Sequence, residues 1–322
     1  MTILVTGAAG FIGYHVCAAL LARGERVIGL DNLAPYYDVA LKRARLEMLA
    51  RHDAFAAVDA SVADREAVLA LGAAHPEIAS VIHLAAQAGV RHSLVDPFAY
   101  VTANVMGHLT MLEMAWRLPA LRHFVYASSS SVYGANAKSP FAVGDPVDAP
   151  RSLYAVTKRA DELMSEAYAG LRGLPQTGLR FFTVYGPWGR PDMSPYIFCR
   201  MIFAGETIPI HNLGFIKRDF SYVGDIVAGV LACHDKPPEG AANRLYNLGA
   251  SRGEDLMRFV ALLEKATGRT AKVELRPAQP GDVPETCADV TATTRDFGWK
   301  PATTIDEGVP KFVDWFRAWH RV

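Results

Sequence analysis

Tyr154 and Lys158, in the segment YAVTK, are the two residues of this sequence whose types and spacing most directly suggest chemistry. In a helix, residues four positions apart lie on one face. A nearby ammonium favours the ionised form of a phenol. A tyrosinate can take the proton of a substrate hydroxyl while a hydride leaves the carbon that carries it. The alternative is an ordinary surface pair, since this spacing is common by chance.

A glycine-rich segment, GAAGFIG, follows an expected strand and opens an expected helix. In this context Gly7 allows a tight turn, Gly10 lets the backbone approach a pyrophosphate, and Gly13 lets the helix pack on the strand. The helix N-terminus adds N–H donors and the positive end of the helix dipole. The pattern predicts a dinucleotide site, with a plain turn as the alternative.

Acidic and small residues at the ends of the next strands fit the same ligand. Asp31 ends the second strand, where a carboxylate binds ribose hydroxyls and repels a 2′-phosphate, which favours NAD over NADP. Asp59, after the third strand, can meet the adenine amino group or serve as a turn residue. The small side chains of Ala85 and Ala86 leave room for a cofactor to lie across the end of their strand; the alternative is that they are ordinary core residues.

The elements that must position these residues alternate between β-rich runs and helical patterns. Most of the strand runs are nearly continuously apolar, as in strands covered on both faces. The expected strands are 2–6, 26–30, 55–59, 80–86, 123–129 and 178–184, and the expected helices are 11–23, 64–74, 97–117 and 152–171. The alternation predicts an α/β fold with a Rossmann-type, doubly wound parallel sheet.

After about residue 185 the sequence becomes richer in Pro and Gly and its elements become shorter. Amphipathic helices are expected at 253–269 and 304–321. We therefore expect two domains. The Rossmann domain, which is expected to bind NAD, covers 1–180 plus about 219–249, and a smaller α/β lobe, which is expected to bind the substrate, covers 181–218 and 250–322.

Composition narrows the classes of partner. The 322 residues are 51% hydrophobic, and 33 basic residues balance 33 acidic ones, which disfavours nucleic acid or an anionic membrane as partner. Four scattered cysteines fit reduced thiols in a cytoplasmic protein better than disulfides or a zinc site. His83, His92 and His211 are not spaced as metal ligands, so no metal is expected.

With a serine-ended strand added, the glycine-rich segment and Y-x-x-x-K make the chain resemble the extended short-chain dehydrogenase/reductases. Within these it is similar to the NAD-dependent nucleotide-sugar epimerases, most of all to UDP-glucuronate 4-epimerases. The segments that carry this likeness are LDNLAPYYDVALKRARL, AAQAGVRHSLVDPFAY, LRFFTVYGPWGRPDM and QPGDVPETCAD. The resemblance implies NAD as cofactor, bound by Gly7, Gly10, Phe11, Ile12, Gly13, Asp31, Asn32, Asp59, Leu84, Ala85, Ala86, Tyr154 and Lys158.

By the same resemblance, Ser129 matches the hydroxyl residue that bonds the sugar 4-hydroxyl, and Ser130 follows where it can reach the hexose. Both could instead satisfy the backbone, and Ser128 is expected to be structural. Related 4,6-dehydratases carry an Asp-Glu pair here, and UDP-glucuronate decarboxylases typically carry a Glu just before V-Y-G. Serine stands at both places in this chain. Because an unassisted hydroxyl is a poor general base, the sequence favours redox chemistry at C4 alone.

Charged residues supply the remaining substrate candidates. Arg190, with Thr183 as a hydroxyl partner, is expected to hold the C6 carboxylate of glucuronate, since a guanidinium suits bidentate carboxylate binding. Arg91 and Arg218 are the candidates for the UDP diphosphate, and Asp282 is the candidate for the uridine ribose. For Arg190 and Asp282 the alternatives are a solvated loop arginine and a turn aspartate.

The expected function is NAD-dependent C4 epimerisation of a UDP-sugar through a 4-keto intermediate, from UDP-glucuronate to UDP-galacturonate. A UDP-glucose/galactose-type 4-epimerase, a UDP-glucuronate decarboxylase and a non-catalytic dinucleotide-sensing protein remain alternatives. A homodimer is also expected, because helices 97–117 and 152–171 carry more apolar residues than one buried face needs, with burial inside one chain as the alternative. Examples are Val101, Val105, Leu109, Leu112 and Met164.

Overall fold

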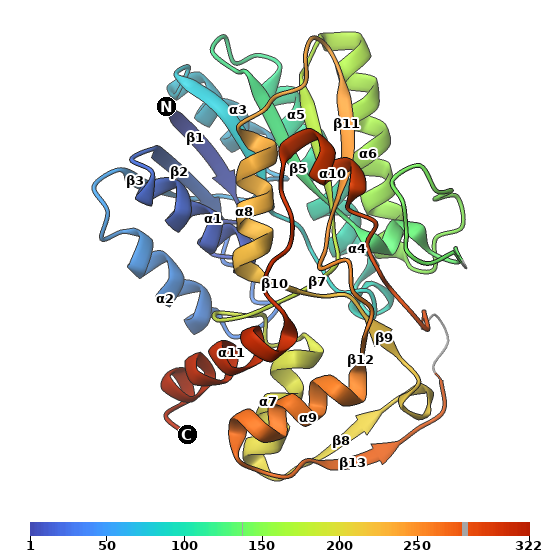
Figure 1. Cartoon of the computed structure of the whole chain (residues 1–322). Coiled ribbons are helices and arrows are strands. Elements are labelled where there is room, and N and C mark those ends of the chain that lie inside the picture. The colour runs from blue at the N-terminus through green and yellow to red at the C-terminus, as the bar shows by residue number, and fades with distance from the viewer. Residues whose placement is uncertain (137, 279–282) are drawn as a thin grey trace. The chain divides into compact units, whose positions relative to one another are not determined.

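The computed structural model describes residues 1–136, 138–278 and 283–322. These form two compact units, each with its own hydrophobic core. Figure 1 labels their helices and strands. Unit 1 comprises Met1–Gly134, Pro146–Arg180 and Val227–Tyr246, and unit 2 comprises Ala135–Asp145, Phe181–Ile226 and Asn247–Val322.

Unit 1 is built on a seven-stranded sheet with the order β11-β6-β5-β4-β1-β2-β3. The strands are β1 (Thr2–Thr6), β2 (Arg26–Asp31), β3 (Phe55–Asp59), β4 (Ile78–His83), β5 (His123–Ser129), β6 (Gln176–Phe181) and β11 (Asn243–Leu248). β1 pairs in parallel with β2 on one side and with β4 on the other. The predicted α/β doubly wound sheet is confirmed. The strand order reverses at β1 and β4, where such sheets bind their ligands beyond the carboxyl ends of the strands.

Helices cover this sheet, and polar side chains cap several of them. Asp38, Asp64, Asp96 and Ser152 each accept a hydrogen bond from a backbone N–H in the first turn of a helix. The helices with most of their residues in unit 1 are α1 (Phe11–Ala22), α2 (Val39–Leu49), α3 (Arg65–Ala74), α4 (Pro97–Tyr100), α5 (Gly107–Ala115), α6 (Leu153–Arg172) and α8 (Val223–His234).

Three of the elements expected from the sequence differ from those in the structure. The expected helix 97–117 is interrupted by a π-helical segment, η2 (Val101–Met106), between α4 and α5. The expected strand 80–86 ends at His83, and the run 178–184 divides into β6 and β7 (Thr183–Tyr185). In each case the backbone geometry changes close to candidate site residues, which an apolar pattern alone does not reveal.

Unit 2 consists of short strand pairs and helices. β7 pairs with β10 (Phe220–Tyr222), β8 (Thr207–Ile210) with β13 (Lys272–Leu275), and β9 (Lys217–Arg218) with β12 (Glu254–Asp255). Its helices are α7 (Ser194–Ala204), α9 (Leu256–Thr267), α10 (Thr291–Phe297) and α11 (Ile305–His320). The Phe220 and Phe259 rings stack 4.2 Å apart in its core.

Neither a membrane-spanning helix nor a metal-binding cluster occurs among the described residues. No helix within 1–136, 138–278 and 283–322 combines the length and apolar character that a membrane crossing needs. Over the same ranges, no cluster of three or more His, Cys, Asp or Glu side chains could hold a metal ion.

Candidate active site

The turn between β1 and α1 is a cradle made of backbone. Gly7 has a φ of +71°, and a Cβ built there would lie 2.9 Å from the Ala85 nitrogen. A Cβ at Gly13 would lie 2.0 Å from the Gly7 oxygen, so a side chain fits at neither position. Gly10 is the N-cap of α1 and provides no side-chain capping bond. The first N–H groups of α1 therefore suit an anion such as a pyrophosphate.

Asp31 holds this cradle from the end of β2. The side chain is buried, and its Oδ2 accepts a hydrogen bond from the Ala9 nitrogen at 3.0 Å while Oδ1 accepts one from the Leu33 nitrogen at 2.9 Å. Asn32 and Asp59 are exposed beside it, at the ends of the neighbouring strands β2 and β3.

The remaining predicted cofactor residues lie at the same edge of the sheet. Leu84, Ala85 and Ala86 follow β4 directly and are half-buried. The Ala85 nitrogen donates to the Thr6 hydroxyl at 3.1 Å, which ties the end of β4 to the end of β1. Unit 1 thus gathers the glycines, Asp31 and these small residues, and the arrangement fits a dinucleotide.

Arg45 supports the glycine-rich turn from α2, a helix that the sequence analysis did not predict. Its guanidinium is fully buried and donates from Nη1 to the Ala9 oxygen at 2.8 Å and to the Tyr37 hydroxyl at 2.9 Å. A buried positive charge under this turn favours a bound phosphate.

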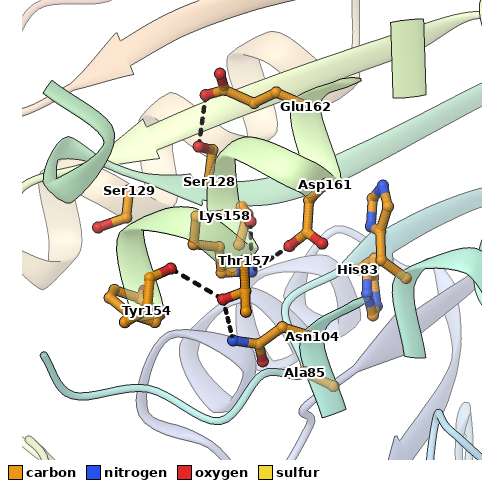
Figure 2. Close-up of polar contacts among 12 residues, drawn as sticks. His83, Ala85, Asn104, Ser128, Ser129, Tyr154, Thr157, Lys158, Asp161 and Glu162 are labelled. Atoms are coloured by element: carbon orange, nitrogen blue, oxygen red, sulfur yellow. Dashed lines mark hydrogen bonds and ion pairs between the residues drawn. The ribbon is translucent and has the colours of Figure 1, made fainter. Parts of the chain in front are cut away.

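Tyr154 and Lys158 lie in the first turns of α6, next to the end of β5 (Figure 2). Ser152 caps the helix by accepting a hydrogen bond from the Ala155 nitrogen at 3.1 Å. Lys158 is 3% exposed, and its Nζ donates to the Ala127 oxygen at 2.9 Å and to Asp161 Oδ2 at 3.0 Å. Tyr154 is half-buried. The ammonium is therefore held by two fixed acceptors on the same helix and on the adjacent strand.

The serine run separates into structural and available hydroxyls. The Ser128 hydroxyl is buried and donates to Glu162 Oε1 at 2.6 Å, which agrees with the structural role predicted for it. Figure 2 shows Ser129 directed away from Glu162. The Ser129 oxygen accepts hydrogen bonds from the Ser131 nitrogen at 3.2 Å and from the Ser131 hydroxyl at 3.0 Å. Because a hydroxyl has two lone pairs and one hydrogen, Ser129 keeps its hydrogen as a donor. Ser130 is half-buried and begins the 3-10 turn Ser130–Tyr133.

Glu162 fixes the end of β5 against α6. Arg180 of β6 donates to it from two nitrogens, at 2.7 and 2.9 Å, and Arg159 donates at 3.0 Å. Burial alone would raise the pKa of Glu162, but the hydrogen bonds and charge of Arg180 outweigh it and lower that pKa. The ionised Glu162 thus connects β6, β5 and α6 behind the serine run.

Asn104 connects the π-helical segment η2 to both sides of the site. Its side-chain nitrogen donates to the Gln87 oxygen at 3.0 Å and to the Thr157 hydroxyl at 2.9 Å, and its oxygen accepts from the Gln87 nitrogen at 2.8 Å. The Thr157 hydroxyl in turn donates to the Tyr154 carbonyl oxygen at 2.9 Å (Figure 2). Asn104 and Thr157 therefore fix the loop after β4 relative to the turn of α6 that carries Tyr154.

The substrate candidates are divided between the units. Arg91 is exposed at the start of a 3-10 turn, η1 (His92–Leu94), in unit 1. Unit 2 contains Thr183 in β7 and Arg218 in β9, where the Arg218 guanidinium donates to the Lys217 oxygen at 2.8 Å. Asp282 lies outside the described residues.

Arg190 lines a small pocket of unit 2 together with Val184, Tyr185, Gly186 and Met193. Its Nε and Nη2 donate to the two carboxylate oxygens of Asp192, at 3.0 and 2.5 Å. The Asp192 carboxylate thus makes the bidentate contact that a substrate carboxylate would make.

Several residues of these networks were not singled out from the sequence, among them Arg45, Asn104, Asp161 and Asp192. Asp161 follows Lys158 by three positions and Asp192 follows Arg190 by two, so opposite charge at short spacing was an available signal. The hydrogen bonds of Arg45 and Asn104 join segments that are distant in the sequence, so no local sequence pattern predicts them.

Comparisons with known proteins agree with this geometry. The model of the NAD dependent epimerase/dehydratase family matches residues 3–249. A probable UDP-glucuronate 4-epimerase of Rhizobium meliloti (strain 1021) is 45% identical over 333 residues, which cover 98% of this chain and 97% of the relative. UDP-glucuronate 4-epimerase 2 of Arabidopsis thaliana is 43% identical over 335 residues, covering 100% of this chain and 77% of the relative. The crystal structure of a Bacillus cereus UDP-glucuronic acid 4-epimerase, in complex with UDP-glucuronic acid and NAD, is similar with a TM-score of 0.92 at 31% identity, covering 99% and 100% of the two chains.

Proposed function

Because the chain belongs to the NAD dependent epimerase/dehydratase family, we propose that it interconverts UDP-glucuronate and UDP-galacturonate by epimerisation at C4. The observation that carries the proposal is the placement of Tyr154, Lys158 and Ser129 at one end of β5, in the unit that also contains the dinucleotide cradle. When bound, NAD supplies the oxidising and reducing equivalents at C4.

The chain's own residues supply proton transfer and orientation. Tyr154 takes the proton of the 4-hydroxyl as C4 is oxidised and returns it when C4 is reduced on the other face. Lys158 holds a positive charge one helical turn from Tyr154, where it stabilises the negative charge that develops during this proton transfer. Ser129 donates its hydrogen to the 4-oxygen of the sugar. The two hydrogen bonds that the Ser129 oxygen accepts from Ser131 hold this hydroxyl in place.

A glucuronate substrate adds one requirement. Oxidation at C4 gives a β-keto acid, which loses carbon dioxide readily when the carboxylate bond aligns with the ketone. Arg190 is the residue that we assign to the carboxylate, because its guanidinium already makes a bidentate contact with a carboxylate in this structure. The substrate carboxylate would replace Asp192 at the guanidinium or share it.

Incubation of the purified protein with UDP-glucuronate and no added NAD tests the function. We expect conversion to a product of unchanged mass that co-elutes with UDP-galacturonate in ion-exchange chromatography, since cofactor is regenerated in each cycle. A product lighter by carbon dioxide would identify a decarboxylase. No product even after NAD is added would contradict the proposal.

Two assignments complete the proposal. We assign the NAD site to unit 1 and the sugar nucleotide mainly to unit 2, which is supported by the cradle in the first and by Arg190 and Arg218 in the second. A cytoplasmic location is supported by the cysteines, since Cys17, Cys199, Cys233 and Cys287 are all free thiols.

We further propose a homodimer, formed through η1, α4, η2 and α6 of unit 1. These elements pack against one another and carry a set of exposed apolar side chains, which we call the apolar face: Leu94, Val95, Phe98, Val101, Met106, Val156 and Leu163. We propose a second copy of this chain as the partner, because in a two-fold symmetric dimer the same patch of each subunit packs against its counterpart. Of the residues named from the sequence for this contact, Val101 is exposed on the apolar face, whereas Leu112 is fully buried in the core of unit 1.

Substitution of Phe98, which is 82% exposed, tests the dimer. We expect Phe98→Asp to convert a dimer into a monomer in sedimentation velocity, because a buried unpaired carboxylate is costly. Phe215→Asp is the matched control, since Phe215 is 78% exposed in unit 2. A wild-type monomer, or a Phe98→Asp protein that remains dimeric, would refute the proposed interface.

A further inference from the structure

The Lys158 ammonium lies in a position that water scarcely reaches. The side chain is 3% exposed, and its carboxylate partner Asp161 is 1% exposed. Burial of a lone ammonium disfavours its charged form strongly. The proposed chemistry needs that charge, so the charge must be compensated by the protein.

The ion pair with Lys158 is the one charged contact of the Asp161 side chain among the described residues. Its Oδ2 accepts from Lys158 Nζ at 3.0 Å, whereas Oδ1 is buried and, among the described residues, accepts no hydrogen bond (Figure 2). A buried carboxylate that serves structure usually has both oxygens satisfied, as Glu162 has through Ser128, Arg159 and Arg180. Asp161 is therefore directed at the lysine alone.

The other titratable groups around this pair do not replace Asp161. On α6, Glu162 is bound by two arginines, and Tyr154 is the phenol that the lysine serves. On β4 and α5, burial lowers the pKa of His83 to about 3 and that of His108 well below its usual range, so both imidazoles are neutral. On β5, burial raises the pKa of Tyr126 and keeps its phenol protonated. Asp161 is the one carboxylate in direct contact with the ammonium among the described residues.

We propose that Asp161 is a positioning residue that supplies the counter-charge on which the buried, protonated Lys158 depends. The inference rests on the proposed function for its catalytic consequence, but its electrostatic core does not. Burial raises the pKa of Asp161 more than the charge and hydrogen bond of Lys158 lower it, which leaves that pKa at about 6, so the carboxylate is ionised at pH 7 and above. Although burial alone would lower the pKa of Lys158, the charge of Asp161 and the influence of Tyr154 raise it above its usual value.

Asp161→Asn tests the proposal because the amide keeps the shape and an oxygen acceptor but removes the charge. Lys158 then becomes an uncompensated buried cation whose pKa falls below that in the unfolded chain. In that case the unfolded state binds more protons, so the variant gains stability as pH rises. We expect the gap in Tm between wild type and Asp161→Asn to shrink by at least about half between pH 7 and pH 9.5.

Three further measurements make this test specific. Adding Lys158→Met to Asp161→Asn should recover much of the lost Tm at pH 7, because it removes the unpaired charge. Asp161→Glu should retain most of the wild-type Tm. Asp235→Asn, which removes an exposed partner of Arg23, should lower Tm little and with no pH-dependent recovery.

The catalytic consequence is read separately. In Asp161→Asn the alkaline limb of the kcat/KM profile should move down by about one pH unit, since Lys158 loses its proton earlier. A Tm gap that stays constant from pH 7 to 9.5, or a double variant less stable than Asp161→Asn, would overturn the proposal. These stability readings need no substrate, so they hold even if wild type fails to convert UDP-glucuronate, which would refute only the proposed function.

Discussion

Tyr154→Phe is expected to lower kcat by roughly 10³-fold while leaving NAD binding nearly unchanged, because proton transfer by a placed side chain contributes about 10²–10⁴-fold. The substitution removes one oxygen from a half-buried ring in the first turn of α6. The Thr157 bond to the Tyr154 backbone and the Lys158 bonds to Ala127 and Asp161 do not involve this oxygen. The fold of the site should therefore survive.

The measurement is the initial rate of UDP-galacturonate formation at saturating UDP-glucuronate. Tyr100→Phe is the matched control, since the Tyr100 ring lies 6.0 Å from that of Tyr154 and its hydroxyl donates to the backbone of Ala88 and Gly89. We expect Tyr100→Phe to lower kcat far less. A Tyr154→Phe protein with near-wild-type turnover would contradict the assignment of the base.

Arg190→Leu is expected to lower kcat/KM for UDP-glucuronate by roughly 10- to 100-fold, which corresponds to the loss of a charge-assisted hydrogen-bonding pair of about 1.5–3 kcal/mol. The residual turnover should release more carbon dioxide per product molecule than wild type does. An unclamped carboxylate can rotate into alignment with the C4 ketone, so the β-keto acid decarboxylates during the cycle.

Ion-exchange separation of the two epimeric nucleotide sugars measures the rate of epimerisation, and mass spectrometry of the same reaction detects the product that has lost carbon dioxide. Arg190→Lys should fall between wild type and Arg190→Leu, because an ammonium keeps the charge and loses the planar fork. Asp192→Asn, which frees the guanidinium from its internal carboxylate, should lower KM for UDP-glucuronate. If Arg190→Leu keeps wild-type kcat/KM and releases no additional carbon dioxide, Arg190 does not hold the carboxylate.

The sequence predicted the sheet well because its strands carry a strong signal. Apolar runs such as TILVT are fully buried in β1, and the spacing of the glycines agrees with the turn observed before α1. By contrast α2 was missed, since the segment VALKRARLEML is rich in charge and has only a weak apolar stripe. The π-helical segment at 101–106 was missed because its side-chain bonds from Asn104 reach residues 17 and 53 positions away.

The site residues are less predictable than the fold. Tyr154, Lys158 and the glycines could be proposed because several signals stood together in order along the chain. The spacing of Lys158 and Asp161 does not by itself predict a buried counter-charge, because an acidic residue three positions after a lysine usually lies on a solvated helix face. Only burial of both side chains distinguishes this pair from a surface ion pair. The roles of Arg91, Thr183, Arg218 and Asp282 stay predictions.

The central claim is that C4 alone is oxidised and reduced, with Tyr154 moving the hydroxyl proton. The most direct measurement is the incubation of UDP-[4-²H]glucuronate with the protein in ordinary water, followed by NMR of the sugar products. We predict UDP-galacturonate that retains deuterium at C4, because the hydrogen removed from this carbon returns to it without exchange. UDP-galacturonate with ordinary hydrogen at C4 would contradict the account.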